Sequence, residues 1–199
     1  MKIIDPSVEL IDVINPDEVL KKIERCGRVC YQSKSREDSA EQFVRMLIKR
    51  GHESVLEHVS LTFRVICDRA IMAELTRHRL ASFSVESTRY VKYDKLEVIA
   101  PTPHKSINLE DWGKSIREAN KRYGFMLSGG CPPEQARAVL PLCLKSELYM
   151  TANLREWRHI LKLRTSKQAH PQMREVANQI LAVFKEKLPV IVEDINHDN

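Results

Sequence analysis

Residues 59–79 of this chain, VSLTFRVICDRAIMAELTRHR, contain the two patterns that decide the fold. An apolar side chain stands at every second position of the first half, and this period of two predicts a strand with one buried face. Asp68 then occupies the position of a helix N-cap, and the apolar residues after it recur at helical spacing. We therefore expect a half-buried strand over 59–66 that leads into a helix over 69–79 with a cationic last turn.

The same patterns elsewhere predict a mixture of strands and helices. Further strands are expected over residues 1–14, 96–100 and 144–151. Further helices are expected over residues 15–30, 43–50, 111–127, 133–139, 154–163 and 172–187. Residues 80–90, LASFSVESTRY, are expected to form a polar loop. Because strands and helices do not alternate in regular βαβ units, the sequence predicts an α/β (α+β) fold, with a central sheet and flanking helices in a single mixed domain over residues 1–199.

The composition favours a soluble protein that binds anions. The net charge of +5 is spread along 199 residues, which suits anionic small molecules as well as nucleic acid. No apolar stretch approaches the roughly 20 residues of a membrane-spanning helix, and the N-terminus opens as a strand rather than a signal peptide. The five cysteines include no CxxC pair, which argues against disulfides and a four-cysteine zinc site. We expect a cytoplasmic protein that does not bind a membrane.

Any nucleotide must be held by side chains, because no glycine-rich phosphate loop is present. The densest polar cluster is Arg77-His78-Arg79 with the residues that follow it. In a last helical turn the two arginines would project about 200° apart, which suits two anionic ligands, or one ligand and a partner subunit. A solvated helix end is the plainer alternative. A nucleic-acid surface would call for more stacking aromatics than Phe83 and Tyr90.

Two further polar clusters are candidate sites. The two histidines of HESVLEH, residues 52–58, are six positions apart, which fits neither a helical HExxH site nor a hairpin, so no metal is expected. Near the C-terminus, Arg155 and His159 share a helical face and Arg158 points away from it. Arg164 follows an apolar run and is expected close to the core.

Four sequence elements together resemble the flavin-dependent thymidylate synthases, the thymidylate synthase complementing protein family. Residues 77–90, RHRLASFSVESTRY, resemble its signature, in which RHR is followed after seven residues by a serine and, two further on, by an arginine. HESVLEH resembles the upstream HxSxxEH element, and ARAVLP at 136–141 resembles ARxVLP. NLREWRHILKLRTSKQAHPQMR at 153–174 resembles the C-terminal block, so the four elements occur in the order of the family.

The resemblance implies a flavoprotein methyltransferase of nucleotide biosynthesis with one catalytic domain. It implies reductive methylation of dUMP to dTMP, with 5,10-methylenetetrahydrofolate as carbon donor and FADH2, reduced by NADPH, as hydride donor. It also implies a homotetramer whose active sites are shared between subunits, and no nucleic-acid partner.

Site residues follow by motif position. For FAD, the resemblance implies His52, Ser54, Arg77, His78, Arg79, Asn153, Arg155 and His159. For dUMP, it implies Glu74, Arg77, Glu86, Ser87, Thr88, Arg89, Arg137 and Arg164. Arg164 is also implied as the catalytic residue, against the uracil ring. The chain departs from the family where Ser84 and Val85 stand in place of Asn-Glu, and where Gln168 replaces a frequent histidine.

The chemistry requires C5 of uracil to become nucleophilic and a methylene group to be reduced to methyl. The fixed charge of Arg164 near a ring carbonyl would stabilise the negative charge that develops there. Two alternatives remain open. Cys143, in the apolar stretch LPLCLK, could serve a cysteine-dependent methyltransferase, although its neighbours favour a packed thiol. A small nucleic-acid-binding module is the other.

Overall fold

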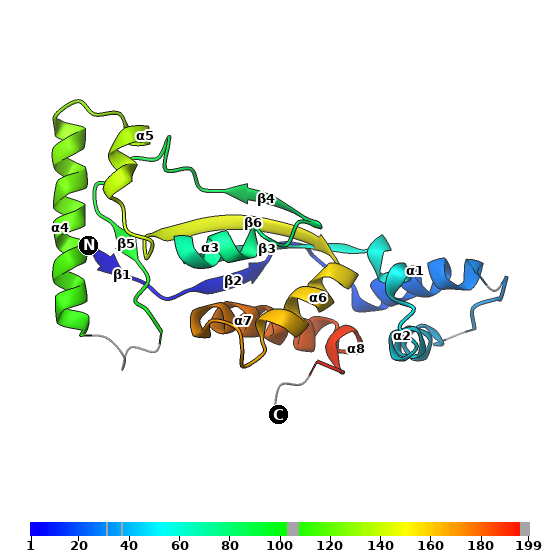
Figure 1. Cartoon of the computed structure of the whole chain (residues 1–199). Coiled ribbons are helices and arrows are strands. Elements are labelled where there is room, and N and C mark those ends of the chain that lie inside the picture. The colour runs from blue at the N-terminus through cyan, green and yellow to red at the C-terminus, as the bar shows by residue number, and fades with distance from the viewer. Residues whose placement is uncertain (31, 37, 103–107, 196–199) are drawn as a thin grey trace.

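A four-stranded antiparallel sheet organises the chain (Figure 1). The computed structural model describes residues 1–30, 32–36, 38–102 and 108–195. In sheet order, the strands are β2 (Ser7–Leu10), β3 (Ser60–Asp68), β6 (Lys145–Asn153) and β4 (Ala81–Val85). Helices flank this sheet, so the predicted mixed fold class is confirmed.

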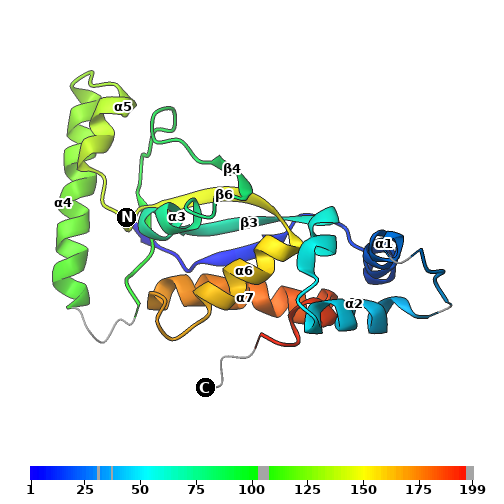
Figure 2. The ribbon, with the colours of Figure 1, turned by 45° about the vertical axis from the view of Figure 1, so that its right-hand side comes forward.

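The core lies between the central strands and two helices. Phe63 of β3 lies opposite Met150 of β6, and both are 0% exposed. Helices α6 (Leu154–Arg164) and α7 (Pro171–Lys187) pack over this face, and the short helix α8 (Pro189–Val192) follows (Figure 2). The ring of Trp157, from α6, lies 5.0 Å from that of Phe63, and its indole N–H donates to the carbonyl of Leu61 at 3.0 Å. The period-two pattern of residues 59–66 thus predicted the buried strand correctly.

The predicted N-terminal strand over residues 1–14 is divided between two sheets. β1 (Lys2–Ile3) pairs in parallel with β5 (Glu97–Val98), whereas β2 joins the large sheet. Pro6 stands between the two strands, where it has no N–H to donate to a ladder. Beyond β2 the chain leaves the sheet, and the carboxylate of Asp12 accepts the backbone N–H of Thr62 at 2.6 Å.

Two helices and a short 3-10 helix form the far end of the molecule. Asn15 caps α1 (Pro16–Val29) as predicted, accepting the N–H of Asp17 at 3.1 Å. α2 (Ala40–Lys49) packs against α1, and Gly51, with a φ of 70°, follows its end. The 3-10 helix η1 (Glu53–His58) then leads into β3 and packs against α6.

A smaller hydrophobic cluster lies under α4 (Leu109–Ser128), which stands at the other end of the sheet (Figure 1). Its buried members are Leu96, Val98, Ile116 and Leu144. Asn108 caps α4, so the helix begins before the predicted Asp111. The predicted helix over 133–139 is α5 (Pro133–Ala136) followed by the 3-10 turn η3 (Arg137–Val139). None of the described helices is both long and apolar enough to cross a membrane.

Two predictions around the RHR motif were wrong. Helix α3 (Arg69–Leu75) ends before Arg77, so the motif forms a turn rather than a cationic last helical turn. The predicted loop over 80–90 contains β4, in which Ala81 and Phe83 face the core between exposed serines. Both errors have a tertiary cause, because pairing with β6 and the buried position of His78 override the local pattern.

Candidate active site

Arg164, the predicted catalytic residue, is held from two sides by the region around the RHR turn. Its Nε donates to Nε2 of His78 at 3.0 Å, and Nη1 donates to Oε2 of Glu74 at 3.1 Å. Nη2 lies 3.4 Å from the carbonyl oxygen of Glu74. The Arg164 side chain is 18% exposed, which confirms its predicted place close to the core. The end of α6 and the end of α3 thus bring three predicted residues into one cluster.

His78 is the buried member of the RHR turn, whereas Arg77 and Arg79 are exposed. Burial and the charge of Arg164 lower the pKa of His78 to about 4, so its ring is neutral near pH 7. On the opposite side of the ring, Oε1 of Glu156 lies 3.6 Å from Nδ1. The ring of His159 stands edge-on with a centroid separation of 6.0 Å.

A metal ion bound by His78, Glu156 and His159 would conflict with the hydrogen bond that His78 already accepts. His78, Glu156 and His159 offer ligand atoms within 4.8 Å of one another. Arg164, however, occupies the Nε2 lone pair of His78, so a metal on Nδ1 would require a ring without either proton. A hydrogen-bonded group therefore accounts for these side chains better than a metal centre.

A groove between η1 and α6 gathers part of the predicted FAD set. Its volume is about 630 Å³, and Asn153, Arg155 and His159 are among its lining residues. The other lining residues are Glu53, Glu57, Leu80, Glu156, Arg158 and Lys162. His52 and Ser54 lie at the start of η1, and both are exposed. Asn153 also caps α6, accepting the N–H of Glu156 at 2.9 Å.

The two arginines at the beginning of α6 differ in role. Arg155 is exposed and lies 2.5 Å from the carboxylate of Glu57, across the groove. Arg158 was predicted to point away from the face of Arg155 and His159, yet it lines the same groove and is only 1% exposed. It pairs with Asp194 at 2.7 Å and with Glu53 at 3.0 Å, and donates to the carbonyl of Ile191. This network ties the C-terminal segment to the groove wall.

Four of the residues predicted for dUMP form a second cluster. Arg137 Nη1 donates to the hydroxyl of Thr88 at 3.3 Å, which joins the ARxVLP element to the RHR signature. The guanidinium of Arg89 lies 3.8 Å from the carboxylate of Glu134, and both side chains are about half exposed. The hydroxyl of Ser87 accepts the backbone N–H of Arg89 at 3.3 Å. Cationic and hydroxyl groups therefore converge here, as an anion site requires.

Glu86, also predicted for dUMP, is already engaged within the chain. Its carboxylate accepts from Nζ of Lys145 at 2.6 Å and from the hydroxyl of Tyr93 at 2.6 Å. Its side chain is 14% exposed. In this arrangement Glu86 anchors the segment that carries Ser87 and Arg89.

The two clusters lie beyond opposite ends of β4. The RHR turn precedes Ala81, which pairs with Ala152, while Ser87 follows Val85, which pairs with Leu148. At about 3.3 Å per residue, the strand separates the turn from the second cluster by well over 10 Å. One bound nucleotide would have difficulty in reaching both clusters of the same chain.

The sequence analysis did not identify two residues that contact the predicted site residues and hold them in place. Glu156 is 7% exposed beside His78, and Lys145 holds Glu86 from β6. The signal for Glu156 was available, because it stands three residues after the cap Asn153 and three before His159 on the same helix. Lys145 had no such signal, since only strand pairing brings it to Glu86.

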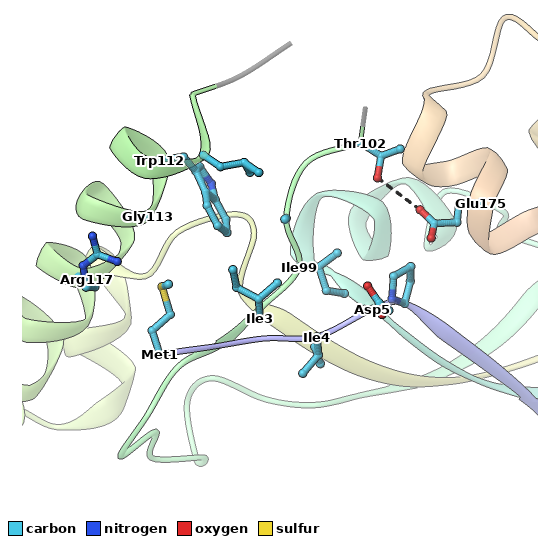
Figure 3. Close-up of a pocket in the computed structure, with 13 residues that line it drawn as sticks. Met1, Ile3, Ile4, Asp5, Ile99, Thr102, Trp112, Gly113, Arg117 and Glu175 are labelled. Atoms are coloured by element: carbon cyan, nitrogen blue, oxygen red, sulfur yellow. Dashed lines mark hydrogen bonds between the residues drawn. The ribbon is translucent and has the colours of Figure 1, made fainter. Parts of the chain in front are cut away.

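A smaller pocket lies away from both clusters (Figure 3). Its volume is about 260 Å³, and it lies between the N-terminal segment, α4 and α7. Trp112 and Ile99 line it, and the hydroxyl of Thr102 lies 3.4 Å from the carboxylate of Glu175 at its edge. Its lining contains none of the predicted site residues.

The fold is that of a pyrimidine nucleotide methylase. A crystal structure of the UMP/dUMP methylase PolB from Streptomyces cacaoi, bound with 5-Br dUMP, matches with a TM-score of 0.82 and 27% sequence identity. The match covers 97% of this chain and 96% of that one.

The sequence comparisons define the family. Residues 9–190 match the family described as thymidylate synthase complementing protein. A probable flavin-dependent thymidylate synthase of a Mycobacterium phage is 33% identical over 216 residues, covering 96% of this chain and 91% of the relative. The flavin-dependent thymidylate synthase of Thermotoga neapolitana is 33% identical over 192 residues, covering 92% and 87%. The chain belongs to the thymidylate synthase complementing protein family.

Proposed function

We propose that this chain is a flavin-dependent thymidylate synthase that converts dUMP to dTMP. The methylene carbon comes from 5,10-methylenetetrahydrofolate, and FADH2 supplies the hydride. Family membership and the likeness to a dUMP-binding methylase support this reaction. The observation that carries this proposal is the position of Arg164. Its guanidinium is mostly buried and is held by Glu74 and His78.

We propose that the groove between η1 and α6 binds FAD. It is large enough, at about 630 Å³, for a substantial part of a dinucleotide. Arg155 and Lys162 are the exposed cations of its lining, and each is paired with a carboxylate here, so a pyrophosphate would bind by taking the place of Glu57 and Asp194. His159 supplies an aromatic edge. When bound, FAD supplies the two-electron reduction that no side chain of the chain could perform. His52, Ser54, Arg77, His78 and Arg79 complete the proposed FAD set.

The phosphate of dUMP is proposed to bind at Ser87, Thr88, Arg89 and Arg137. The hydrogen bond between Arg137 and Thr88 supports this site, because it brings a cation from a distant motif to a hydroxyl. Glu86 acts by holding this segment in place. Glu74 and Arg77 belong to the uracil side of the proposed site.

Arg164 provides electrostatic catalysis in this proposal. Attack by C5 of uracil is easier when negative charge on the ring carbonyl is stabilised, and a pre-oriented guanidinium does so without reorganising at the moment of reaction. Glu74 and His78 fix its orientation. The side of the Arg164 guanidinium that contacts His78 is shielded from water, because His78 is only 5% exposed.

The separation of the two clusters by β4 supports active sites shared between subunits. One chain would supply the phosphate cluster and another the Arg164 cluster, which we propose occurs in a homotetramer. NADPH is the proposed reductant of the flavin. The five cysteines are free thiols, which supports the proposed location in the cytoplasm. We also propose that residues 1–199 form one catalytic domain.

The alternative cysteine mechanism has less support. Burial raises the pKa of Cys143 to about 11, so that the nucleophilic thiolate would be scarce near neutral pH.

A product assay tests the proposed function. Protein freed of bound flavin is incubated with dUMP, methylenetetrahydrofolate, FAD and NADPH, and dTMP is measured by chromatography with each component omitted in turn. We expect dTMP only when the flavin and its reductant are present. Formation of dTMP without flavin would contradict the proposal.

A further inference from the structure

We propose that Glu156 is a positioning residue that fixes the tautomer of His78 and, through His78, the orientation of Arg164. The consequence for catalysis rests on the proposed function, whereas the arrangement of protons does not. Glu156 belongs to neither predicted ligand set, yet it is one of few buried carboxylates, with 7% exposure.

The hydrogen bond from Arg164 shows which nitrogen of His78 carries the proton in this structure. An arginine side chain has donors and no acceptor, so Nε2 of His78 must offer its lone pair to Nε of Arg164 at 3.0 Å. A neutral imidazole has one N–H, and that proton therefore lies on Nδ1. In a doubly protonated ring, the N–H at Nε2 of His78 would point at the N–H of Arg164 Nε, and the two donors would repel each other.

The Nδ1 proton faces Glu156. Oε1 of Glu156 lies 3.6 Å from Nδ1, and a shift of a few tenths of an ångström would make this contact a hydrogen bond. Burial raises the pKa of Glu156, and an N–H donor would compensate its charge. Its place in the first turn of α6, where Asn153 caps the helix, also favours a negative charge.

The four side chains therefore form an ordered series from Glu156 through His78 and Arg164 to Glu74. Each contact in it joins a donor to an acceptor. Without the carboxylate of Glu156, the tautomer with a proton on Nε2 would become accessible. That proton would oppose Nε of Arg164 and turn the guanidinium away from its present orientation.

Nitrogen-15 NMR of histidine-labelled protein tests the proton positions directly, and needs no turnover. The signal of His78 is assigned by its loss in His78→Gln. We expect a protonated Nδ1 and an unprotonated Nε2 in the wild-type protein, and a changed tautomer ratio in Glu156→Leu. A proton on Nε2 in the wild-type protein, or an unchanged ratio in the variant, would overturn the proposal.

Kinetics add a second readout. Glu156→Leu should lower kcat about tenfold or more, the scale of losing one group that orients a charged side chain, with the KM for dUMP little changed. Glu156→Gln should restore most of kcat, because its amide oxygen still accepts from Nδ1.

Glu24→Leu is the matched control, since Glu24 is 4% exposed in α1 and pairs with Arg28 rather than with the site. It should lower stability and leave the His78 tautomer unchanged. Equal effects of the Glu24 and Glu156 changes on kcat would reduce Glu156 to a structural role and contradict the proposal. If the wild-type protein formed no dTMP, the proposed function would fail while the nitrogen signals would still decide the proton positions.

Discussion

Arg137 donates a hydrogen bond of 3.3 Å to the hydroxyl of Thr88, although 49 positions separate the two residues in the chain. Each belongs to a different sequence motif, and Thr88 is 4% exposed. The bond brings the guanidinium of Arg137 to the segment that carries Ser87 and Arg89. A cation and several donors thereby converge at one place, as a phosphate site requires.

Replacement of Arg89 by alanine tests this site. We expect the affinity for dUMP to fall about tenfold or more, because a charge-assisted hydrogen bond to phosphate is lost. Calorimetric titration with dUMP measures the effect. Arg122→Ala is the matched control, because Arg122 pairs with Glu118 on the exposed side of α4. Equal affinities of the wild-type and Arg89→Ala proteins would place the phosphate elsewhere.

Replacement of Arg164 by alanine should reduce turnover by roughly 100-fold to 1000-fold, the cost of losing one group that stabilises developing negative charge. Flavin content should remain close to that of the wild-type protein, since the proposed FAD groove is lined by other residues. Steady-state kinetics and the absorbance of bound flavin measure the two effects. Near-normal turnover in this variant would remove the electrostatic role of Arg164.

Cys143→Ala separates the flavin mechanism from the cysteine mechanism. We expect kcat to stay within about twofold of the wild-type value, because the thiol is packed and its raised pKa disfavours the thiolate. The assay is dTMP formation under saturating substrates. Complete loss of turnover in a folded variant would favour the cysteine alternative.

Much of the fold could be predicted because local sequence patterns determine many of its strands and helices. The alternation along residues 59–66 predicted β3, and Asn15 predicted the beginning of α1. The RHR turn and β4 could not be predicted in the same way. Their structure depends on pairing with β6 and on the buried place of His78, which are contacts between distant parts of the chain.

The candidate site shows the same division. Motif spacing predicted Arg164 and His78 as site residues, and the structure brings Arg164 to His78. Spacing gave no means of finding Lys145, because only the sheet brings it to Glu86. A residue that supports a ligand-binding residue can often be identified only from tertiary contacts, whereas many ligand-binding residues can be identified from sequence motifs.

Acid should weaken the attachment of the C-terminal segment. The hydrogen bond from Arg158 lowers the pKa of Asp194 from 3.8 to about 2. A lowered carboxyl pKa contributes stability above the unfolded value, and this contribution is lost as the pH falls from about 4 towards 2. We expect the free energy of unfolding of the wild-type protein to exceed that of Asp194→Asn near pH 6, with a smaller difference near pH 3.

Urea denaturation of both proteins at several pH values measures this difference. Glu41→Gln is a suitable control, because its partner Arg45 is exposed and such pairs contribute little. A difference between wild-type protein and Asp194→Asn that grows on acidification would contradict the assignment.

The visible spectrum of the purified protein tests most directly the claim that a bound flavin supplies the electrons for methylation. We predict flavin absorbance that bleaches anaerobically with NADPH and returns when dUMP and methylenetetrahydrofolate are added together. Folded protein that is colourless and takes up no FAD, or reduced flavin that stays reduced in the presence of both substrates, would contradict the account.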